Sequence, residues 1–295
     1  WAVQLRRSCK WGEAAEALNK ALLLLDGLGN AHQTIHAKRG LALLLWKRGR
    51  LDDSWVLACQ CMEASARDGH DMLKAYAQLL RTVVSMHMGD LAGAEESARM
   101  VVGWGLYGES RAALLAAEYM ADIYLERGDV QRALASYEEL SARAAAIAPK
   151  GDIVGDVHCR RAECHYIKGE AEKAHAEAVV ALKHWQALGD RYEEAATHRI
   201  LALSAAAVGR PDEARKWFDE GFAFYEDIQT PYEWGKLWMA YGDWLLGPHA
   251  GVHADRRGAH EAYLAAQDHF ERIGAKAKLA EANERLQQGM ATRPH

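Results

Sequence analysis

Residues 121–133 read Ala-Asp-Ile-Tyr-Leu-Glu-Arg-Gly-Asp-Val-Gln-Arg-Ala, a pattern that decides the fold of this 295-residue chain. A small residue, Ala121, lies seven positions before Gly128, and a second, Ala133, lies five positions after it. A glycine permits a tight turn, and small side chains allow the helices on either side of that turn to approach closely. The stretch therefore predicts two antiparallel helices joined by a short turn.

The same pattern recurs with a period near 40 residues. Successive glycines are separated by 37, 40, 39, 41 and 40 residues. The pairs of a glycine and the small residue after it are Gly12/Ala17, Gly49/Ser54, Gly89/Ala94, Gly128/Ala133, Gly169/Ala174 and Gly209/Ala214. The small residues that precede the last five glycines are Ala42, Thr82, Ala121, Ala162 and Ala202. A fixed period of this size is typical of stacked repeat units.

The segments around each glycine carry a helical period. Leu41, Leu44 and Leu45 repeat at steps of three and four residues, and no stretch shows the alternation expected of a strand. Residues 230–233 read Thr-Pro-Tyr-Glu, which combines a helix N-cap, a proline at the first helical position and a capping-box glutamate. The sequence therefore predicts an all-α protein.

The predicted fold is an α-solenoid of about seven antiparallel helix pairs followed by a C-terminal closing helix, because one pair alone cannot bury its apolar face. The pairs are expected near 1–27, 31–67, 70–104, 107–147, 152–187, 190–228 and 231–273, and the closing helix near 276–289. An insertion over 247–257 replaces the turn of the seventh pair, and a solvated loop is expected there. A single array over 1–295 is expected, and the initial Trp1 predicts that it is excised from a larger protein.

These residues resemble the tetratricopeptide repeat (TPR) family, whose unit is two antiparallel helices with small residues at the crossing and a glycine at the turn. The resemblance covers essentially the whole chain and implies a right-handed α-solenoid. Only Tyr137 and Phe218 supply the aromatic residue that the family carries late in the second helix, and the family's closing proline is mostly absent. The units are also longer than the family's period of about 34 residues.

A narrower resemblance rests on unit length and on the junctions Leu188-Gly-Asp190 and Ile273-Gly-Ala275. Long units of this kind are similar to the sensor arrays of bacterial multidomain signalling and transcription regulators, such as ATP-dependent activators of the maltose-operon type. This resemblance implies a regulatory domain that senses a ligand.

Composition argues against several classes of function. The chain has 41 acidic and 36 basic residues and a net charge of −5, which disfavours direct binding to nucleic acid or to a membrane surface. Five cysteines, an odd number, favour reduced thiols and a cytoplasmic location. The longest apolar runs are far shorter than the roughly 20 residues that a transmembrane helix needs.

Motifs for catalysis and for cofactors are weak. Residues 103–108 read Gly-Trp-Gly-Leu-Tyr-Gly, which fits the letters of the dinucleotide fingerprint, but no strand precedes them. No phosphate-binding loop and no nucleophile elbow occurs. We therefore expect no enzyme activity and no cofactor.

Histidine and cysteine cluster in one helical stretch, and the histidines His249, His253 and His260 lie in or just after the insertion, where a solvated loop is the favoured interpretation. His158 and His165 share a helix face but lie about 10 Å apart along the axis, which is too far for one tetrahedral zinc ion. Cys159 and Cys164 point away from each other and are expected to be buried thiols. No metal site is predicted.

In the TPR family the first helix of each pair lines the concave face, and the small crossing residue sets the register. Transferred to this sequence, that register gives the candidate binding residues Arg39, Trp46, Tyr76, Glu118, Asp122, Glu126, Asp156, Glu163, Arg199 and Lys236. Trp234 and Trp238 lie on a first helix too and are further candidates for ligand contact.

The most informative candidates are acidic. Glu118, Asp122 and Glu126 stand four residues apart on one helix face, where each like-charge pair costs about 0.2–0.5 kcal/mol in an isolated helix. Asp156 and Glu163 follow in the next unit. Two interpretations remain open: a solvated face, or a site for a basic peptide or cationic ligand. The arginines that would partly neutralise a solvated face are Arg127, Arg160 and Arg161.

Two classes of function are consistent with these features. The first is a non-catalytic scaffold whose concave groove holds a peptide or protein partner. A basic segment of that partner is one candidate for the part that binds. The second is the ligand-sensing regulatory domain of a bacterial multidomain regulator, whose partner is a small-molecule effector or another domain of the parent protein. The rival contact regions are the basic end near Arg39 and Lys47 and the insertion at 247–257.

Overall fold

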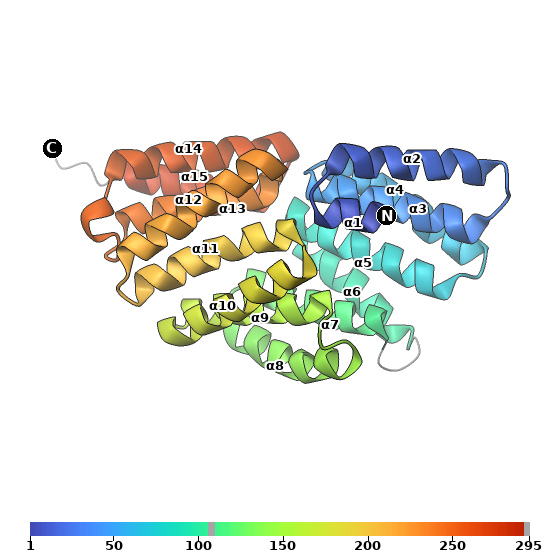
Figure 1. Ribbon diagram of the computed structural model, residues 1–295, viewed down its shortest axis with the longest axis horizontal. Coiled ribbons are helices and arrows are strands. Elements are labelled where there is room, and N and C mark those ends of the chain that lie inside the picture. The colour runs from blue at the N-terminus through green and yellow to red at the C-terminus, as the bar shows by residue number, and fades with distance from the viewer. Residues whose placement is uncertain (106–109, 292–295) are drawn as a thin grey trace. The chain divides into compact units, whose positions relative to one another are not determined.

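The computed structural model describes residues 1–105 and 110–291 (Figure 1). Within these residues the fold is all-α, with helices α1 to α15 and no strand. The predicted fold class, antiparallel helix pairs with a closing helix, is therefore confirmed. The expected helix start at residue 107 and the last three residues of the Gly103–Gly108 motif lie outside the described residues.

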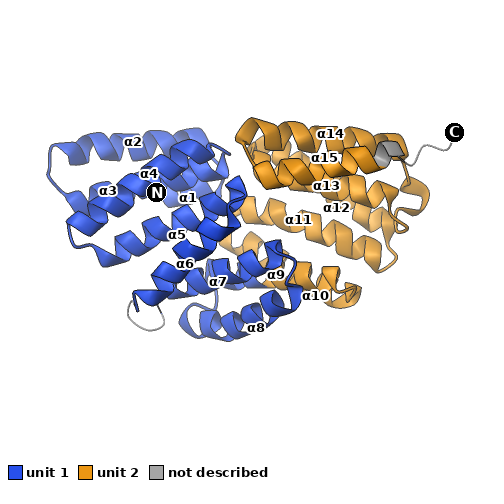
Figure 2. Cartoon of the chain, turned by 180° about the vertical axis from the view of Figure 1, so that it is seen from behind, with its two compact units in different colours: residues 1–157 blue, residues 158–295 orange. Residues whose placement is uncertain are grey.

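The chain divides into two compact units, residues 1–157 and residues 158–295 (Figure 2). The division lies within helix α9 (Asp152–Ile167). Unit 1 contains α1 (Ala2–Arg7), α2 (Trp11–Asp26), α3 (Ala31–Lys47), α4 (Leu51–Arg67), α5 (Asp71–Met88), α6 (Leu91–Gly103), α7 (Arg111–Glu126) and α8 (Val130–Ile147). Unit 2 contains α10 (Ala171–Leu188), α11 (Arg191–Ala207), α12 (Pro211–Ile228), α13 (Pro231–Leu246), a 3₁₀ turn (Gly251–His253), α14 (Arg256–Ile273) and α15 (Lys276–Ala291).

The turns inside the helix pairs are made by glycines in the left-handed region. Gly49, Gly89 and Gly128 have φ values of 75°, 90° and 80°, which a residue with a Cβ adopts only at a cost. The backbone N–H of each following residue then bonds to a carbonyl in the last turn of the first helix, as Asp129 does with Tyr124 at 2.9 Å. The glycine period thus marks the places where the first helices end.

The first pair departs from the expected register. Gly12 lies inside α2, and the left-handed residue of this turn is Cys9, with φ 56°. Cys9 lies 40 residues before Gly49, and Ala14, five residues after Cys9, is fully buried. The repeat unit therefore begins with Cys9/Ala14, and the expected pair Gly12/Ala17 is wrong. Sequence inspection missed this turn because a cysteine occupies the glycine position.

Small residues at the helix crossings are buried as their pattern predicts. Ala42, Ala121, Ala162 and Ala202 are each 0% exposed. Ser54 replaces alanine after the turn at Gly49, and its buried hydroxyl donates a hydrogen bond to the Ala42 carbonyl over 2.8 Å. The polar residue is accepted in the core because its hydroxyl has this partner.

Most residues of the insertion at 247–257 are exposed, as expected of a solvated loop, but a few of them contact the rest of unit 2. His253 Nε2 lies 2.8 Å from Asp212 Oδ1 on α12, and the His253 ring lies 5.5 Å from the ring of Trp244. Ala250 is fully buried, and the Asp255 side chain accepts a hydrogen bond from the Arg257 N–H at the start of α14. These contacts order the segment locally.

Among the described helices, none is both long enough and apolar enough to cross a membrane.

Candidate functional site

The first helices of unit 1 pack against one another as well as against their own partners. Helix α5 contacts both α3 and α7, whereas the second helices α4, α6 and α8 pack between successive first helices or behind them. The candidate residues on α3, α5 and α7 therefore occupy neighbouring helices. We call the side of unit 1 that carries Arg39, Tyr76 and Glu118 its first-helix face.

Arg39 and Tyr76 are brought into contact on this face. The Arg39 guanidinium carbon lies 5.0 Å from the centre of the Tyr76 ring, within the range of a cation–π interaction. The Arg39 Nε is buried and has no hydrogen-bond partner among the described residues. Burial lowers the pKa of Arg39, and the positive charges of Arg111 and Arg6 lower it further.

Arg111 is a residue that sequence reasoning missed. It opens α7 and forms an ion pair with Asp152, which opens α9. These residues lie 41 positions apart, so the repeat period places them at equivalent positions in consecutive units. Opposite charges at equivalent positions one period apart were the signal that could have identified the pair.

Trp46 packs between two first helices. Its indole Nε1 donates a hydrogen bond to His87 Nδ1 over 3.0 Å, joining the end of α3 to the end of α5. The ring is partly buried against the cluster that includes Val83 and Val84. Trp46 therefore has a structural role in joining α3 to α5, whether or not it also contacts a ligand.

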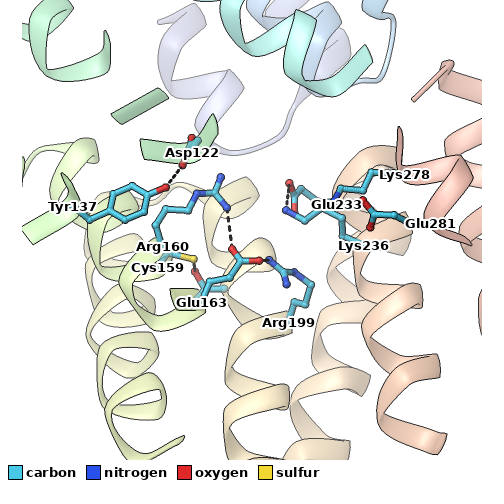
Figure 3. A network of polar contacts seen from close by, with 11 residues as sticks. Asp122, Tyr137, Cys159, Arg160, Glu163, Arg199, Glu233, Lys236, Lys278 and Glu281 are labelled. Carbon is cyan, nitrogen blue, oxygen red and sulfur yellow. Dashed lines mark hydrogen bonds and ion pairs between the residues drawn. The ribbon is translucent and has the colours of Figure 1, made fainter. Parts of the chain in front are cut away.

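The acidic residues of α7 differ in their surroundings. Glu118 and Asp122 are buried, at 5% and 7% exposure, whereas Glu126 is exposed. The Tyr137 hydroxyl donates a hydrogen bond to Asp122 over 2.5 Å (Figure 3). The stripe of like charge on α7 is therefore not uniformly solvated.

The charges of three carboxylates act on Tyr119. Burial raises the pKa of Tyr119, and the negative charges of Glu118, Asp156 and Asp122 raise it further, while Arg111 opposes them. We call Glu118, Asp122 and Asp156 the acidic trio of unit 1. Arg127 was expected to help neutralise the α7 stripe, but its guanidinium pairs with Glu95 on α6.

In unit 2 the candidate charges are paired with one another. Glu163 lies between Arg199, at 2.9 Å, and Arg160, at 3.4 Å (Figure 3). Burial by itself would raise the pKa of Glu163, but Arg199, Lys236 and Arg160 together hold it well below its usual range. Lys236 also lies 3.4 Å from Glu233. Because these charges already have partners, a ligand in unit 2 would have to compete with them.

The tryptophans of α13 are engaged in packing. The Trp238 ring lies 4.1 Å from the Phe222 ring on α12, and the Trp234 ring lies 4.7 Å from the His269 ring on α14. Both side chains are only partly exposed. Their main contacts join α13 to its neighbours.

The histidines and cysteines of α9 do not converge. His158 Nδ1 lies 2.6 Å from Glu177, and His165 Nδ1 lies 2.7 Å from Glu170. Cys164 is buried. Across the described residues, no group of three or more metal-ligating side chains is arranged to hold a metal ion.

The sequence matches no protein-family model and no curated protein. Solved structures do match. NprR in complex with its cognate peptide NprX aligns with a TM-score of 0.64 and 17% identity, over 94% of this chain and 82% of that one. The fold is TPR-like.

Two further structures have this fold. Bacillus thuringiensis PlcR, in complex with the peptide PapR7 and DNA, aligns with a TM-score of 0.62 and 12% identity, over 70% of this chain and 74% of that one. A signal-transduction ATPase from Pyrococcus horikoshii, described as having a tetratricopeptide repeat sensor, aligns with a TM-score of 0.59 and 13% identity. That alignment covers 98% of this chain but 44% of the ATPase.

Proposed function

We propose that this chain is a non-catalytic scaffold that binds a peptide or protein segment on its first helices. The observation that carries the proposal is the first-helix face of unit 1, where Arg39, Tyr76, Glu118 and Asp122 place charged and aromatic groups on the adjacent helices α3, α5 and α7. Charged groups give orientation to a bound segment, and aromatic side chains supply contact area. The TPR-like structures of NprR and PlcR, each described as a complex with a peptide, support this proposal.

The residues proposed to contact the segment are those that the register selects on the first helices. They are Arg39, Trp46, Tyr76, Glu118, Asp122, Glu126, Asp156, Glu163, Arg199 and Lys236. In unit 2, Glu163 is paired with Arg199 and Lys236 with Glu233, so a segment bound there would compete with these ion pairs.

The acidic trio is proposed to receive a basic side chain of the segment. Like charges held close together repel one another, and a bound cation would relieve that repulsion. Binding should weaken as salt rises, because salt screens the long-range attraction between the acidic trio and an approaching basic segment.

The test neutralises two carboxylates of the trio without inverting their charge, because a lysine at buried Glu118 would add an uncompensated charge. The variant is Glu118→Gln with Asp156→Asn, and its matched control is Glu138→Gln with Glu139→Gln, two exposed positions on α8. Binding of Lys- and Arg-containing peptides is measured by calorimetry at two salt concentrations. We expect at least about tenfold weaker binding for the trio variant and unchanged binding for the control. Equal binding by both variants would contradict the role of the trio.

A second candidate function is the sensor of a bacterial multidomain regulator that responds to a small ligand. It is favoured by the alignment of 98% of this chain with a protein described as a signal-transduction ATPase with a repeat sensor. A calorimetric screen of metabolites alongside the peptides separates the two functions. Saturable binding of a metabolite with no binding of peptides would favour the sensor.

A further inference from the structure

A chain of side-chain hydrogen bonds in unit 1 has a methionine sulfur at each end. Arg81 Nη1 on α5 donates one hydrogen bond to Met62 Sδ on α4 over 3.1 Å and another to Gln78 Oε1 over 3.0 Å. Gln78 Nε2 in turn donates to Met100 Sδ on α6 over 3.7 Å. These four side chains link α4, α5 and α6, and we call them the thioether chain.

The N–H groups of the thioether chain have poor acceptors. A thioether sulfur accepts hydrogen bonds only weakly, whereas buried N–H groups normally have a strong acceptor. Gln78 is 1% exposed, and its Nε2 faces Met100 because Arg81 holds its Oε1. Arg81 stacks over Trp55 at 4.7 Å and forms no ion pair with any described residue. An oxygen atom on either sulfur would be a better partner for these N–H groups.

The two sulfurs of the thioether chain differ in their access to solvent. Met100 is 43% exposed and borders a shallow surface hollow of about 410 Å³. Met62 is half-buried, and the Arg81 N–H at 3.1 Å occupies a sulfur lone pair that an oxidant would need. Met100 is therefore the sulfur that an oxidant in solution reaches first. The other residues that line the hollow are Ala92, Glu95, Glu96 and Arg99.

We propose that Met100 is a site of reversible oxidation by hydroperoxides, and that Gln78 is its positioning residue. The Gln78 N–H exchanges its weak bond to sulfur for a stronger one to a peroxide oxygen, and after the reaction it holds the oxygen of the sulfoxide. Methionine sulfoxide is polar and chiral, and reductases that are each specific for one epimer return it to the thioether. A donor fixed on one side of Met100 Sδ selects one epimer.

The reaction is a two-electron transfer of oxygen. A lone pair of Met100 Sδ attacks the outer oxygen of the hydroperoxide, so that the S–O bond forms as the O–O bond breaks. The proton of the transferred oxygen passes to the leaving oxygen, which departs as water from hydrogen peroxide or as an alcohol from an organic hydroperoxide. The sulfur is oxidised by two electrons and the peroxide is reduced by two.

The first experiment treats the full chain with limiting hydrogen peroxide and follows each methionine by peptide mass spectrometry. The epimers of the sulfoxide at Met100 are distinguished by their reduction with the two epimer-specific reductases. We expect Met100 to be oxidised before Met62, and one epimer to predominate at Met100. Free methionine in the same solution is the reference without a fixed donor. Oxidation of Met62 before Met100, or the epimer ratio of free methionine at Met100, would overturn the site.

A variant of Gln78 tests its positioning role. Gln78→Glu keeps an oxygen for Arg81 but removes the N–H that faces Met100, and Gln131→Glu at an exposed position on α8 is the matched control for the added charge. We expect oxidation of Met100 in Gln78→Glu to be about two- to tenfold slower and to lose its excess of one epimer, since one hydrogen bond is missing. The control should match the original chain. An unchanged rate and epimer ratio in Gln78→Glu would contradict the role of Gln78.

Thermal stability separates a built site from oxidative damage. Sulfoxide formation in a packed region usually disrupts it. Here we expect oxidation to raise the melting temperature of the original chain by about 1–4 °C relative to Met100→Leu treated in the same way, because the new oxygen satisfies the buried Gln78 N–H. A melting temperature that oxidation lowers in the original chain but not in Met100→Leu would show damage at Met100 and would overturn the proposal.

Discussion

At the scale of single residues, His198 on α11 couples the stability of unit 2 to pH. Its side chain is 2% exposed, stacks against Trp217 at 5.6 Å and meets the edge of Phe224 at 5.1 Å. Burial lowers the pKa of His198 from 6.5 to about 4. Between pH 6.5 and 4, His198 is therefore mostly protonated in the unfolded chain but mostly neutral in the folded chain. The stabilising effect of the neutral ring is complete above pH 6.5 and is lost as the pH falls toward 4.

We expect His198→Phe to flatten this pH dependence. A shift from 6.5 to about 4 corresponds to about 3 kcal/mol of stability lost between those pH values, and phenylalanine keeps the ring contacts without titrating. Urea denaturation at pH 7.5 and pH 4.5 measures the difference, with exposed His260→Phe as the control. Some slope should remain, because burial also lowers the pKa of His269 to about 4. An unchanged slope in His198→Phe would contradict the assignment.

At the scale of helices, the close approach of α13 and α14 depends on two glycines. A Cβ at Gly242 would lie 2.6 Å from Cε1 of Tyr263, and one at Gly235 would lie 2.7 Å from Cε1 of Phe270. Gly242 holds the small crossing position in the seventh pair, where the other pairs have alanine or threonine. The larger aromatic partner on α14 explains why a glycine is needed there.

We predict that Gly242→Ala destabilises the protein although alanine is the better helix former. The overlap with Tyr263 should cost about 1–3 kcal/mol, which exceeds the gain of about 1 kcal/mol in helix propensity. Gly12→Ala is the control, because nothing lies within 4 Å of a Cβ at that position in α2. Urea denaturation followed by circular dichroism should show a lower midpoint for the first variant and an equal or higher one for the second. The reverse order would refute the close-packing explanation.

At the scale of the whole molecule, α15 closes the last helix pair. Ala282 and Leu286 are buried, and Gln267 on α14 donates a hydrogen bond to Asn283 over 2.7 Å. Glu284 and Gln287, on other sides of the helix, are exposed. Helix α15 thus has the polar outer face and apolar inner face of a capping element, which stacked repeats need for solubility.

Deleting residues 276–295 should expose the apolar surface that α15 covers. We expect a lower melting temperature, increased binding of the dye ANS and association that depends on protein concentration. A shorter deletion of residues 292–295 provides the control, since it leaves the buried positions of α15 in place. If both deletions behave like the full chain, α15 has no capping role.

The helix pairs were predictable because their determinants are local. A glycine at a left-handed turn and small residues at fixed distances from it act over a few residues, and their period near 40 specifies the stacking. The first unit was misread because its left-handed turn residue is Cys9, and only the structure shows a cysteine in that conformation.

Tertiary structure alone decided which charges meet. Arg39 and Tyr76, 37 residues apart, touch because α3 and α5 pack side by side, and the neutralisation of Glu163 depends on Arg199 on the next first helix. The helical register placed these residues on first helices, but long side chains can reach several neighbours. The distances between packed helices decide which ion pairs form, and they leave the buried Nε of Arg39 without a hydrogen-bond partner among the described residues. No local sequence pattern encodes these distances.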